Sequence, residues 1–271
     1  MDINDRLQDG LVLLGCGKMG SAMLAGWLDQ NIDPENIWII EPNPSEWLQS
    51  LNIHLNKNLP ERAALALVAV KPQMMQQALP RLASYASGST IFLSVAAGIS
   101  IDAYESILGK GATVVRAMPN TPAAIGQGIT ALIGNDATGA DALQLCQELL
   151  GAIGKTVRLE TEEQMDAVTG VSGSGPAYVF FMIDALAAAG QAQGLPADLA
   201  MQLATATVSG AGALAAQSRE TPEQLRINVT SPNGTTQAGL EVLMHPQDGL
   251  RPLIMETVAK AAGRSRELSN G

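Results

Sequence analysis

Residues 11–30 read LVLLGCGKMGSAMLAGWLDQ. The apolar run at residues 11–14 is expected to form a strand, and residues 21–30 place apolar side chains at the spacing of a helix. Between them, Gly15, Gly17 and Gly20 have the spacing G-x-G-x-x-G. A glycine loop that directly follows a strand and opens a helix has the context of the dinucleotide-binding motif. We therefore expect a strand–loop–helix unit that binds a pyrophosphate group.

The three glycines of this loop have separate physical reasons. The first permits the tight turn, the second lets the backbone approach a pyrophosphate, and the third lets helix and strand pack closely. Free N–H groups at the start of the helix then face the anion. The alternatives are a purely structural glycine turn and a Lys18 that is simply solvated. The expected cofactor contacts are Gly15, Gly17, Lys18, Met19 and Gly20.

Further apolar runs alternate with helical stretches in the first half of the chain. Nearly continuous apolar strands separated by helices indicate a parallel sheet that is covered on both faces. We therefore predict an α/β fold with a doubly wound, Rossmann-like sheet. The expected strands are residues 11–14, 36–40, 65–70, 90–95 and 113–117, and the helices among them include residues 73–85 and 101–108.

No convincing strand follows residue 162. Gly194 before Pro196, and the stretch at residues 246–249, supply helix stop signals. We predict a dinucleotide-binding domain over residues 1–161 and an all-helical domain over residues 162–271. The expected helices of the second domain are residues 163–168, 177–193, 197–217, 222–229, 235–244 and 250–268.

The predicted helix at residues 197–217 carries Ala, Gly, Thr and Ser on nearly every face. A helix without a polar face is normally buried all round. A domain of about 110 residues offers little room to bury such a helix within one chain. We therefore expect a homodimer formed through the C-terminal helices.

Composition excludes several classes of protein. The 271 residues include 16 Lys and Arg against 26 Asp and Glu, which gives a formal net charge of −10. General nucleic-acid binding needs a basic surface instead. Apolar residues make up 46% and aromatic residues only 3%, so aliphatic side chains must build the core. The polar first ten residues are unlike a secretory signal, and the apolar stretch at residues 178–189, interrupted by Asp184, is shorter than a membrane span.

Few residues are available for metal or nucleophilic chemistry. Cys16 and Cys146 lie far apart and have no metal-like or redox-like spacing, so we expect two free buried thiols in a reducing cytoplasm. His54 and His245 have no neighbouring ligand in the sequence, which disfavours a metal site and a Ser-His-Asp hydrolase. We expect a cytoplasmic protein that binds a small molecule and no metal, nucleic acid or membrane.

Glu41 follows the second expected strand, about 20 residues beyond the glycine loop, where a carboxylate bonds a ribose 2′-hydroxyl. A 2′-phosphate would be repelled there, so this local signal favours NADH. Pro42 and Pro44 can turn Glu41 away, and Asn43 can donate to either group. Glu41 and Asn43 are both expected cofactor contacts.

The later strands end in small residues and prolines, at the edge where open α/β sheets bind ligands. The three ends are residues 69–72, residues 95–98 and residues 116–122. Met118 either packs on a nicotinamide face or fills the core. The expected cofactor contacts here are Ala69, Val70, Lys71, Pro72, Ala96, Ala97, Met118, Pro119 and Asn120.

Three further strings occur in order: AMPNTP at residues 117–122, SGSGPAY at 172–178 and TSPNGTT at 230–236. Together with the glycine loop and AVKP at residues 69–72, they resemble the pyrroline-5-carboxylate reductase family over residues 11–268. The resemblance implies a Rossmann domain followed by a helical domain that dimerises, often within larger rings. It also implies reduction of Δ1-pyrroline-5-carboxylate to L-proline with NADPH, or with NADH. By the same resemblance, Asn56 and residues 69–72 contact the cofactor and residues 231–236 hold the substrate.

Two positions depart from the family's pattern. Asn233 stands where the family usually has glycine. Because asparagine tolerates a left-handed backbone better than most residues, the loop shape is expected to survive. Glu41-Pro42 replaces the small or polar residues common in NADP-dependent members, so NADPH and NADH both stay open.

Reduction of an imine requires neither a histidine base nor a metal. A protonated cyclic imine is already an electrophile, so the protein supplies placement and electrostatics. Thr236 is the candidate to hydrogen-bond the ring nitrogen, and the segment before the next helix forms an N–H nest for the substrate carboxylate. Ser174, as a helix cap, and Gly175 begin another helix; the alternative is that both strings are only helix starts. The expected substrate contacts are Ser231, Asn233, Gly234, Thr235, Ser174 and Gly175.

Two rival functions share parts of this pattern. A β-hydroxyacid dehydrogenase has a similar loop and a helical domain, but it needs a general base, typically a lysine on the helix after a glycine pair. Residues 179–193 contain no lysine, which argues against it. A dinucleotide sensor without catalysis would have no use for the string at residues 230–236.

Overall fold

The computed structural model describes residues 2–270, which contain an eight-stranded sheet in the order β3-β2-β1-β4-β5-β6-β7-β8. All neighbouring strands are parallel except β6 and β7, which are antiparallel. The first six strands have the doubly wound order, so the predicted α/β fold is confirmed. The strands are β1 Leu11–Leu14, β2 Ile37–Ile40, β3 His54–Leu55, β4 Leu65–Val68, β5 Ile91–Ser94, β6 Thr113–Met118, β7 Gly128–Gly134 and β8 Gly154–Arg158.

The five expected strands are present, and three others were missed. β7 carries glycines at both ends, and β8 reads GKTVR and is largely exposed, so neither is a continuous apolar run. β3 has only two residues, which is too short to show any alternation. An edge strand does not need two apolar faces, and this is why the pattern that finds buried parallel strands does not find β8.

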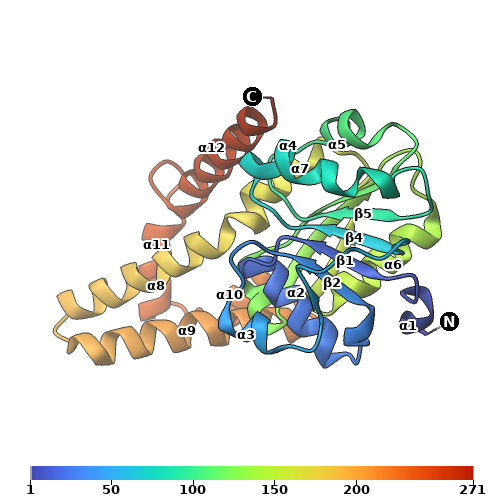
Figure 1. The fold of residues 1–271 in the computed structure, drawn as a ribbon. Coiled ribbons are helices and arrows are strands. Elements are labelled where there is room, and N and C mark those ends of the chain that lie inside the picture. Colours follow the sequence, from blue (N-terminus) through green and yellow to red (C-terminus); the bar gives the residue numbers. More distant parts are fainter. Residues whose placement is uncertain (1, 271) are drawn as a thin grey trace. The chain divides into compact units, whose positions relative to one another are not determined.

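Helices cover both faces of the sheet (Figure 1). On one face, Met23, Leu24 and Trp27 of α2 (Lys18–Asp29) join the apolar cluster of Leu11 and Leu13 in β1. On the other face, Val12 and Leu14 join Tyr104 of α5 (Ile101–Leu108) in a second cluster. Side chains of a strand alternate between the two faces, which explains why consecutive residues of β1 belong to different clusters.

Short helical segments complete this part of the chain. The predicted helix at residues 73–85 is broken into three pieces, and Pro80 lies in the last of them. Residues of α6 pack on the same face of the sheet as α2, whereas α4 and η3 pack on the opposite face. The segments are α1 Ile3–Arg6, η1 Pro34–Asn36, α3 Glu46–Ser50, η2 Pro72–Met74, α4 Met75–Ala78, η3 Leu79–Tyr85, η4 Thr121–Ile125, α6 Ala140–Gly151, α7 Gln164–Val168 and the π-helical turn η5 Thr169–Gly173.

The chain divides into two compact units at residues that differ from the sequence-based boundary at 161. The first unit comprises residues 1–173 and 261–271, and the second comprises residues 174–260. Residues after 161 belong to the first unit because their contacts lie there: Met165 is buried, and Asp166 accepts a hydrogen bond from Ser265 at 2.6 Å.

The second unit contains helices only. Within it, α8 packs against α9 through Ala187, Ala200 and Ala204, which are its most deeply buried residues. α9 is therefore not buried all round within one chain; most of its side chains are exposed. The helices are α8 Gly175–Ala192, α9 Ala197–Gln217, α10 Pro222–Asn228, α11 Thr235–Leu243 and α12 Leu250–Asn270, whose last turns belong to the first unit.

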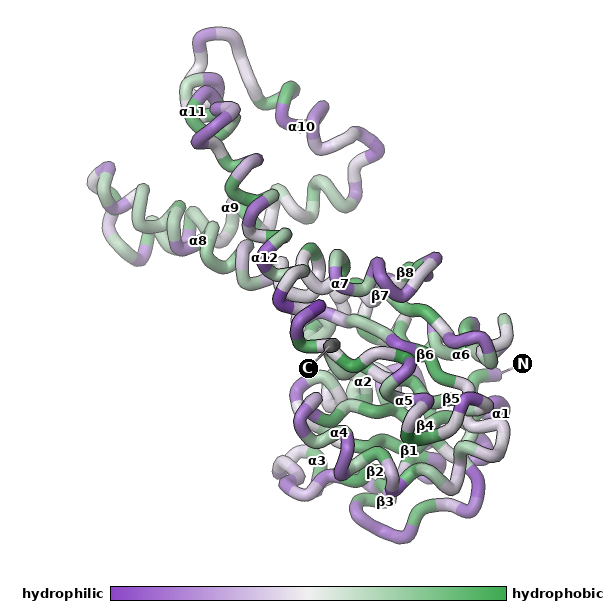
Figure 2. The backbone as a smooth tube through the Cα atoms, turned by 90° about the horizontal axis from the view of Figure 1, so that it is seen from above, coloured by the Kyte–Doolittle hydropathy of each residue, from purple (hydrophilic) through white to green (hydrophobic). Residues whose placement is uncertain are grey.

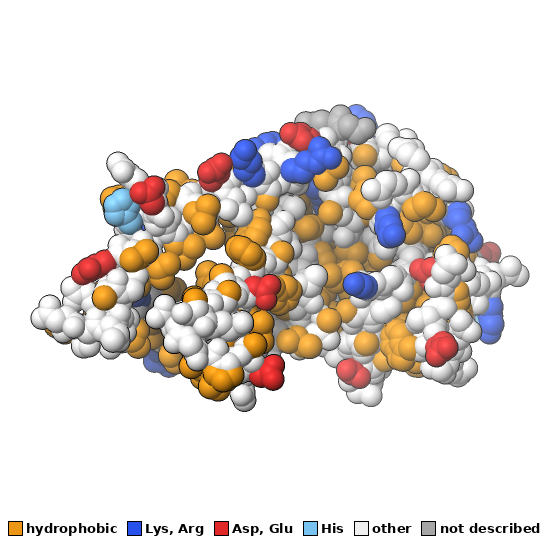
Figure 3. All heavy atoms as spheres, turned by 90° about the vertical axis from the view of Figure 1, so that its left-hand side faces the viewer, with side chains coloured by type: hydrophobic (Ala, Val, Ile, Leu, Met, Phe, Trp, Pro, Cys, Tyr) orange, Lys and Arg blue, Asp and Glu red, His pale blue; other side chains and the backbone are white. Residues whose placement is uncertain are grey.

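Apolar side chains lie exposed on this helical unit (Figure 3), and α8 and α9 have mainly apolar sequences (Figure 2). Phe180 is 61% exposed and Phe181 is 74% exposed. Two helical stretches, Gln164–Ala192 and Ala197–Gln217, are long and apolar enough to cross a membrane by length and composition alone. The expectation that no segment reaches this length is therefore wrong, because helical backbone runs on from α7 into α8 and small residues count as apolar. One or two such helices are weak evidence of a membrane protein, since an interface between subunits also requires apolar helix faces.

A buried hydrogen bond joins the two helices on one face of the sheet and yields a stability prediction. Trp27 is fully buried, and its indole Nε1 donates to the carbonyl oxygen of Leu149 in α6 at 2.8 Å. Trp27→Phe removes this donor and part of the ring, so the free energy of unfolding should fall by at least about 1–3 kcal/mol. The measurement is the urea midpoint at one fixed protein concentration. Trp47→Phe, at a 40% exposed tryptophan, is the matched control and should change stability by no more than about 0.5 kcal/mol. Equal losses in both variants would contradict the prediction.

Candidate dinucleotide and substrate sites

The glycine loop lies at the carboxyl end of β1, between the ends of β2 and β4. Gly15 has φ +90°, and its N–H donates to the carbonyl oxygen of Ile40 at 2.9 Å. A Cβ at this position would come within 2.9 Å of the Ala69 carbonyl oxygen, and a Cβ at Gly20 would come equally close to that of Gly15. These two glycines are therefore required by the protein's own backbone.

Gly17 has no such internal reason. Its φ is −72°, which any residue can adopt, and a Cβ built on it meets no atom within 4 Å. Gly17 is also the N-cap of α2, and no side chain caps that helix. An open space in front of uncapped N–H groups suits an anion that approaches the backbone closely. The loop therefore fits a dinucleotide pyrophosphate, and Gly17, Lys18 and Met19 border that space.

The end of β2 is held against this loop by side-chain hydrogen bonds. One carboxylate oxygen of Glu41 accepts the N–H of Cys16 at 2.8 Å, and the other accepts the N–H of Asn43 at 2.9 Å. The prolines on either side of Asn43 thus do not turn Glu41 away from the loop. Asn56, at φ +51°, accepts the N–H of Glu41 at 2.9 Å and donates to its carbonyl oxygen at 2.8 Å. Asn56 therefore positions Glu41, a role that its sequence context did not indicate.

The four residues that follow β4 differ in their exposure beside the glycine loop. Ala69 and Val70 are half-buried and lie where a side chain at Gly15 would collide with them. Lys71 and Pro72 are exposed and begin η2. The latter pair is thus freely accessible from solution, and the former shapes the turn beneath the loop.

The end of β5 is fixed by a buried polar group. Ser94 and Tyr104 are joined by a hydroxyl–hydroxyl hydrogen bond, and Ser94 Oγ also accepts the N–H of Ala96 at 3.2 Å. Burial raises the pKa of Tyr104 to about 12, although the bond to Ser94 and the charge of Arg116 act in the opposite direction. Tyr104 is therefore neutral at physiological pH and serves to hold this loop. Ala96 is buried, and Ala97 is exposed.

An ion pair that the sequence did not suggest supports the neighbouring loop. Arg116 is buried in β6, and its Nη1 lies 2.5 Å from Oε1 of Glu162. The same carboxylate oxygen accepts the N–H of Ile101, at the start of α5, at 2.9 Å. A buried guanidinium needs such partners. Glu162 therefore ties β6 to α5.

The loop after β6 is structural in most of its contacts. Pro119 is buried, and Asn120 Oδ1 accepts the N–H of Ile129 at 3.0 Å, which fixes η4 on β7. The methyl group of Met118 occupies the space that a Cβ at Gly173 would need, at 2.6 Å. Met118 therefore packs beside Gly173, and its contact with a nicotinamide stays a prediction.

Neither cysteine has the character of a nucleophile. Burial raises the pKa of Cys146 to about 12. Burial also raises the pKa of Cys16, as does the charge of Glu41, against a lowering by the hydrogen bond with Ser21. Both cysteines are free and buried, as the sequence predicts, and both thiols are protonated at neutral pH.

The TSPNGTT string forms a tight loop that opens α11 in the second unit. Asn233 has φ +58°, so it does adopt the left-handed conformation expected of it, and its N–H donates to Gln237 Oε1 at 2.8 Å. A Cβ at Gly234 would come within 2.5 Å of Ser231 Oγ. No side chain caps α11, and Ser231, Thr235 and Thr236 are exposed. The loop therefore presents hydroxyl groups and a free helix N-terminus to a small anion.

The SGSGPAY string behaves differently. Ser174 has helical backbone angles and makes no capping hydrogen bond, so its expected role as a helix cap is wrong. The reason is that η5 precedes α8 without a break in the helical backbone, and a cap needs an extended residue. Gly175 is the first residue of α8, and a Cβ there meets no atom within 4 Å.

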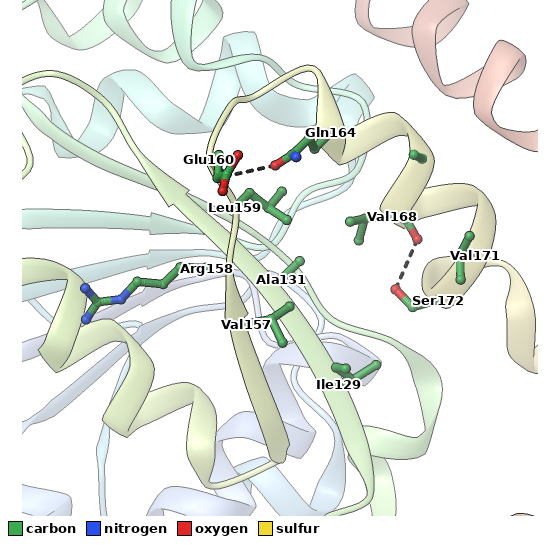
Figure 4. Close-up of a pocket in the computed structure, with 11 residues that line it drawn as sticks. Ile129, Ala131, Val157, Arg158, Leu159, Glu160, Gln164, Val168, Val171 and Ser172 are labelled. Atoms are coloured by element: carbon green, nitrogen blue, oxygen red, sulfur yellow. Dashed lines mark hydrogen bonds between the residues drawn. The ribbon is translucent and has the colours of Figure 1, made fainter. Parts of the chain in front are cut away.

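A separate open cavity of about 590 Å³ lies in the first unit, along β7, β8 and the helical stretch that contains α7 and η5 (Figure 4). Its lining is mainly aliphatic, from residues such as Ile129, Val157 and Val171. Its two hydrogen bonds in Figure 4 are internal to the lining: Gln164 accepts the N–H of Glu160, and Ser172 donates to the carbonyl of Val168. None of the predicted site residues lines it. Within residues 2–270, no group of three His, Cys, Asp or Glu residues is placed to hold a metal ion.

Comparison with known proteins assigns both halves of the chain. Residues 162–268 match the family model described as pyrroline-5-carboxylate reductase dimerisation, and residues 11–98 match the one described as NADP oxidoreductase, coenzyme F420-dependent. The pyrroline-5-carboxylate reductase of Pisum sativum is 38% identical over 278 residues, which cover 99% of this chain and 100% of that protein. The chain belongs to the pyrroline-5-carboxylate reductase family.

Solved structures of family members have the same fold. The pyrroline-5-carboxylate reductase of Coxiella burnetii superposes with a TM-score of 0.88 at 30% identity, covering 96% of this chain and 98% of that one. The pyrroline carboxylate reductase of Plasmodium falciparum, solved with NADP bound, superposes with a TM-score of 0.81 at 28% identity over the same shares. The dimerisation model begins at residue 162, whereas the second compact unit begins at residue 174.

The contrast between Gly17 and Gly20 yields a prediction about cofactor binding. Gly17→Ala adds a methyl group to open space, so the fold should be unaffected while the dissociation constant for the reduced dinucleotide rises about tenfold or more. Binding is followed by nicotinamide fluorescence and the fold by thermal unfolding. Gly20→Ala is the comparison variant, because its methyl group meets the Gly15 carbonyl oxygen and should lower the melting temperature. Unchanged binding by a folded Gly17→Ala variant would contradict the assignment.

Proposed function

We propose that this chain catalyses the NAD(P)H-dependent reduction of Δ1-pyrroline-5-carboxylate to L-proline, the last step of proline biosynthesis. The observation that carries the proposal is the relationship to named pyrroline-5-carboxylate reductases over nearly the whole chain. The geometry agrees with it at two places. The space in front of Gly17 and α2 suits a dinucleotide, and the loop at residues 230–236 suits a small carboxylate.

The substrate's chemistry explains why so few titratable groups are needed. The carbon of a protonated C=N bond is electrophilic, and the bound reduced nicotinamide supplies the hydride. The product is a secondary amine, so the nitrogen keeps the proton that it already carries. The chain's task is then to hold the ring in one orientation and to stabilise its charges.

The residues of the loop have distinct proposed roles. Thr236 hydrogen-bonds the ring nitrogen, directly or through water. The N–H groups at the start of α11, with Ser231, Asn233, Gly234 and Thr235, hold the carboxylate. Asn233 supports this role by adopting the left-handed turn that a glycine would otherwise provide. Gly175, at the open start of α8, and Ser174, directly before it, are further proposed substrate contacts.

The proposed cofactor site consists of the glycine loop and the strand ends around it. Gly17, Lys18 and Met19 face the pyrophosphate, Glu41 and Asn43 face the adenosine ribose, and exposed Ala97, Lys71 and Pro72 border the rest. The remaining predicted cofactor contacts complete the proposed site, and several of them also hold its backbone in place. They are Gly15, Gly20, Asn56, Ala69, Val70, Ala96, Met118, Pro119 and Asn120.

The proposed assembly is a homodimer, or a ring of dimers, formed through the C-terminal helices. The support is the dimerisation-family match, together with exposed apolar side chains on α8 and α9. Association would bury the exposed apolar side chains of these helix faces, which are unfavourable in contact with water. We also propose a cytoplasmic location, which agrees with two free buried cysteines.

The decisive experiment is an absorbance assay at about 340 nm, where reduced nicotinamides absorb. The purified chain should oxidise NADPH or NADH only when the cyclic imine acid is added, and L-proline should appear in equal amount. Oxidation of the alcohol of a β-hydroxy acid instead would identify the rival dehydrogenase. Cofactor binding without turnover of the imine acid would identify a non-catalytic sensor.

Removal of the Thr236 hydroxyl tests the mechanism. Thr236→Ala should lower kcat by about tenfold or more, because one positioned hydrogen bond to the ring nitrogen is lost. Thr236→Ser keeps the hydroxyl and should recover most of the rate. Ser231→Ala should mainly raise KM for the imine acid. A folded Thr236→Ala variant with unchanged kinetics would remove Thr236 from the mechanism.

A charge on the exposed face of α8 tests the assembly. The native chain should sediment at twice 28.2 kDa or a higher multiple. Phe181→Glu places a carboxylate at a 74% exposed phenylalanine, and its burial in an interface would be costly, so the variant should dissociate at a higher concentration. Gln193→Glu adds the same charge at an exposed polar position and should leave the mass unchanged. A native monomer at micromolar concentration would contradict the proposal.

A further inference from the structure

The proposed function leaves one property of the site undecided, namely which dinucleotide it prefers. The two candidates differ only at the adenosine ribose, which carries a 2′-hydroxyl in NADH and a 2′-phosphate in NADPH. In a doubly wound sheet, that ribose lies beside the end of the second strand. The residues at the end of β2 therefore decide the preference, and here they are Glu41 and its hydrogen-bond partners.

Glu41 is fixed in place through both its backbone and its side chain. The amide of Asn56 clamps its N–H and its carbonyl oxygen, at 2.9 and 2.8 Å. Its carboxylate oxygens hold the N–H groups of Cys16 and Asn43, at 2.8 and 2.9 Å. The residue is held at four points, two of them on its carboxylate, so the carboxylate cannot swing away to admit a phosphate without breaking its bonds to Cys16 of the glycine loop and to Asn43.

The unused capacity of this carboxylate matches a diol. An ionised carboxylate has about four lone-pair positions and no donor. Two positions are occupied by backbone N–H groups, so acceptor capacity remains for the ribose hydroxyls, which are donors. A 2′-phosphate offers only acceptor oxygens and about 1.5 to 2 negative charges, so it would face the carboxylate without a hydrogen bond and with repulsion.

No cation compensates for this charge within the segment itself. Residues 41–50, EPNPSEWLQS, contain two glutamates and no lysine or arginine. Recognition of a phosphate ester usually relies on arginine or lysine. Lys57, which follows Asn56, is the first lysine or arginine in the sequence after this segment, and it is exposed.

We propose that Glu41, positioned by Asn56, makes this reductase prefer NADH over NADPH. The inference rests on the proposed function for the identity of the ligand, but it concerns the adenosine end, which takes no part in hydride transfer. The native protein binds NADH at least tenfold more tightly than NADPH, which corresponds to about 1.4 kcal/mol. The cause of this preference for NADH is the Glu41 carboxylate, which is hydrogen-bonded to the glycine loop.

The test is equilibrium binding of NADH and NADPH to the full-length protein, followed by nicotinamide fluorescence and by calorimetry. Glu41→Gln removes the charge and should reduce the NADH/NADPH affinity ratio tenfold or more, mainly by tighter NADPH binding. Glu41→Asp keeps the charge and should keep NADH preferred. Glu46→Gln, in the same segment but with an exposed side chain, removes an equal charge and should leave the ratio unchanged. Thermal unfolding of each variant reports whether the loop has kept its fold.

Three results would overturn the proposal. They are equal or tighter binding of NADPH by the native protein, a Glu41→Gln variant that is folded and has an unchanged ratio, and a selective loss of NADPH binding in Lys57→Gln that reveals a phosphate site there. Failure of the proposed function has a different signature. In that case NADH binds with the stated preference, but the imine acid is not reduced.

Discussion

The first unit depends on the close packing at one residue, Gly15. Its N–H is bonded to the end of β2, and the place of its missing side chain is taken by the backbone that follows β4. Because β1 lies between these strands, the chain order of the sheet reverses here and leaves a crevice at the carboxyl edge. The start of α2, the open space at Gly17 and the contact between Glu41 and Cys16 all follow from this turn. A side chain at residue 15 would force β4 and the loop apart and disturb each of them.

The sequence predicts the buried part of the sheet well because a strand that is buried on both faces is apolar at nearly every position. β1, β4 and β5 are buried at every position, and their sequences are apolar throughout except for Ser94 at the end of β5. β8 has exposed Lys155 and Arg158, and β7 runs antiparallel to β6, so neither strand shows the continuous apolar run of a buried parallel strand. The extension of the first unit into residues 162–173 was missed for another reason. It depends on tertiary contacts of Glu162 and Met165, which no local pattern contains.

In the candidate sites, too, the sequence predicts local backbone constraints but not the tertiary partners of side chains. The glycine spacing expresses a backbone constraint, so the position of the loop can be predicted from sequence. The left-handed conformation of Asn233 could also be anticipated, because few other side chains tolerate it. The hydrogen-bond and packing partners of the side chains could not be anticipated from the sequence. Asn56 and Asn120 bond the protein's own backbone, and Met118 packs against Gly173, and none of these contacts could be read from the sequence.

The hydrogen bonds of Glu41 have a practical consequence for redesign of the coenzyme preference. The carboxylate that we propose to select the ribose also satisfies two backbone N–H groups, one of them in the glycine loop. Selectivity and loop rigidity are thus coupled in one side chain, and a substitution that admits a phosphate also releases part of the scaffold that binds the pyrophosphate. A successful exchange of coenzyme would have to replace both acceptors as well as the charge, for example by pairing a change at residue 41 with a compensating polar residue near Asn43. Single substitutions at this position should therefore trade total affinity for selectivity.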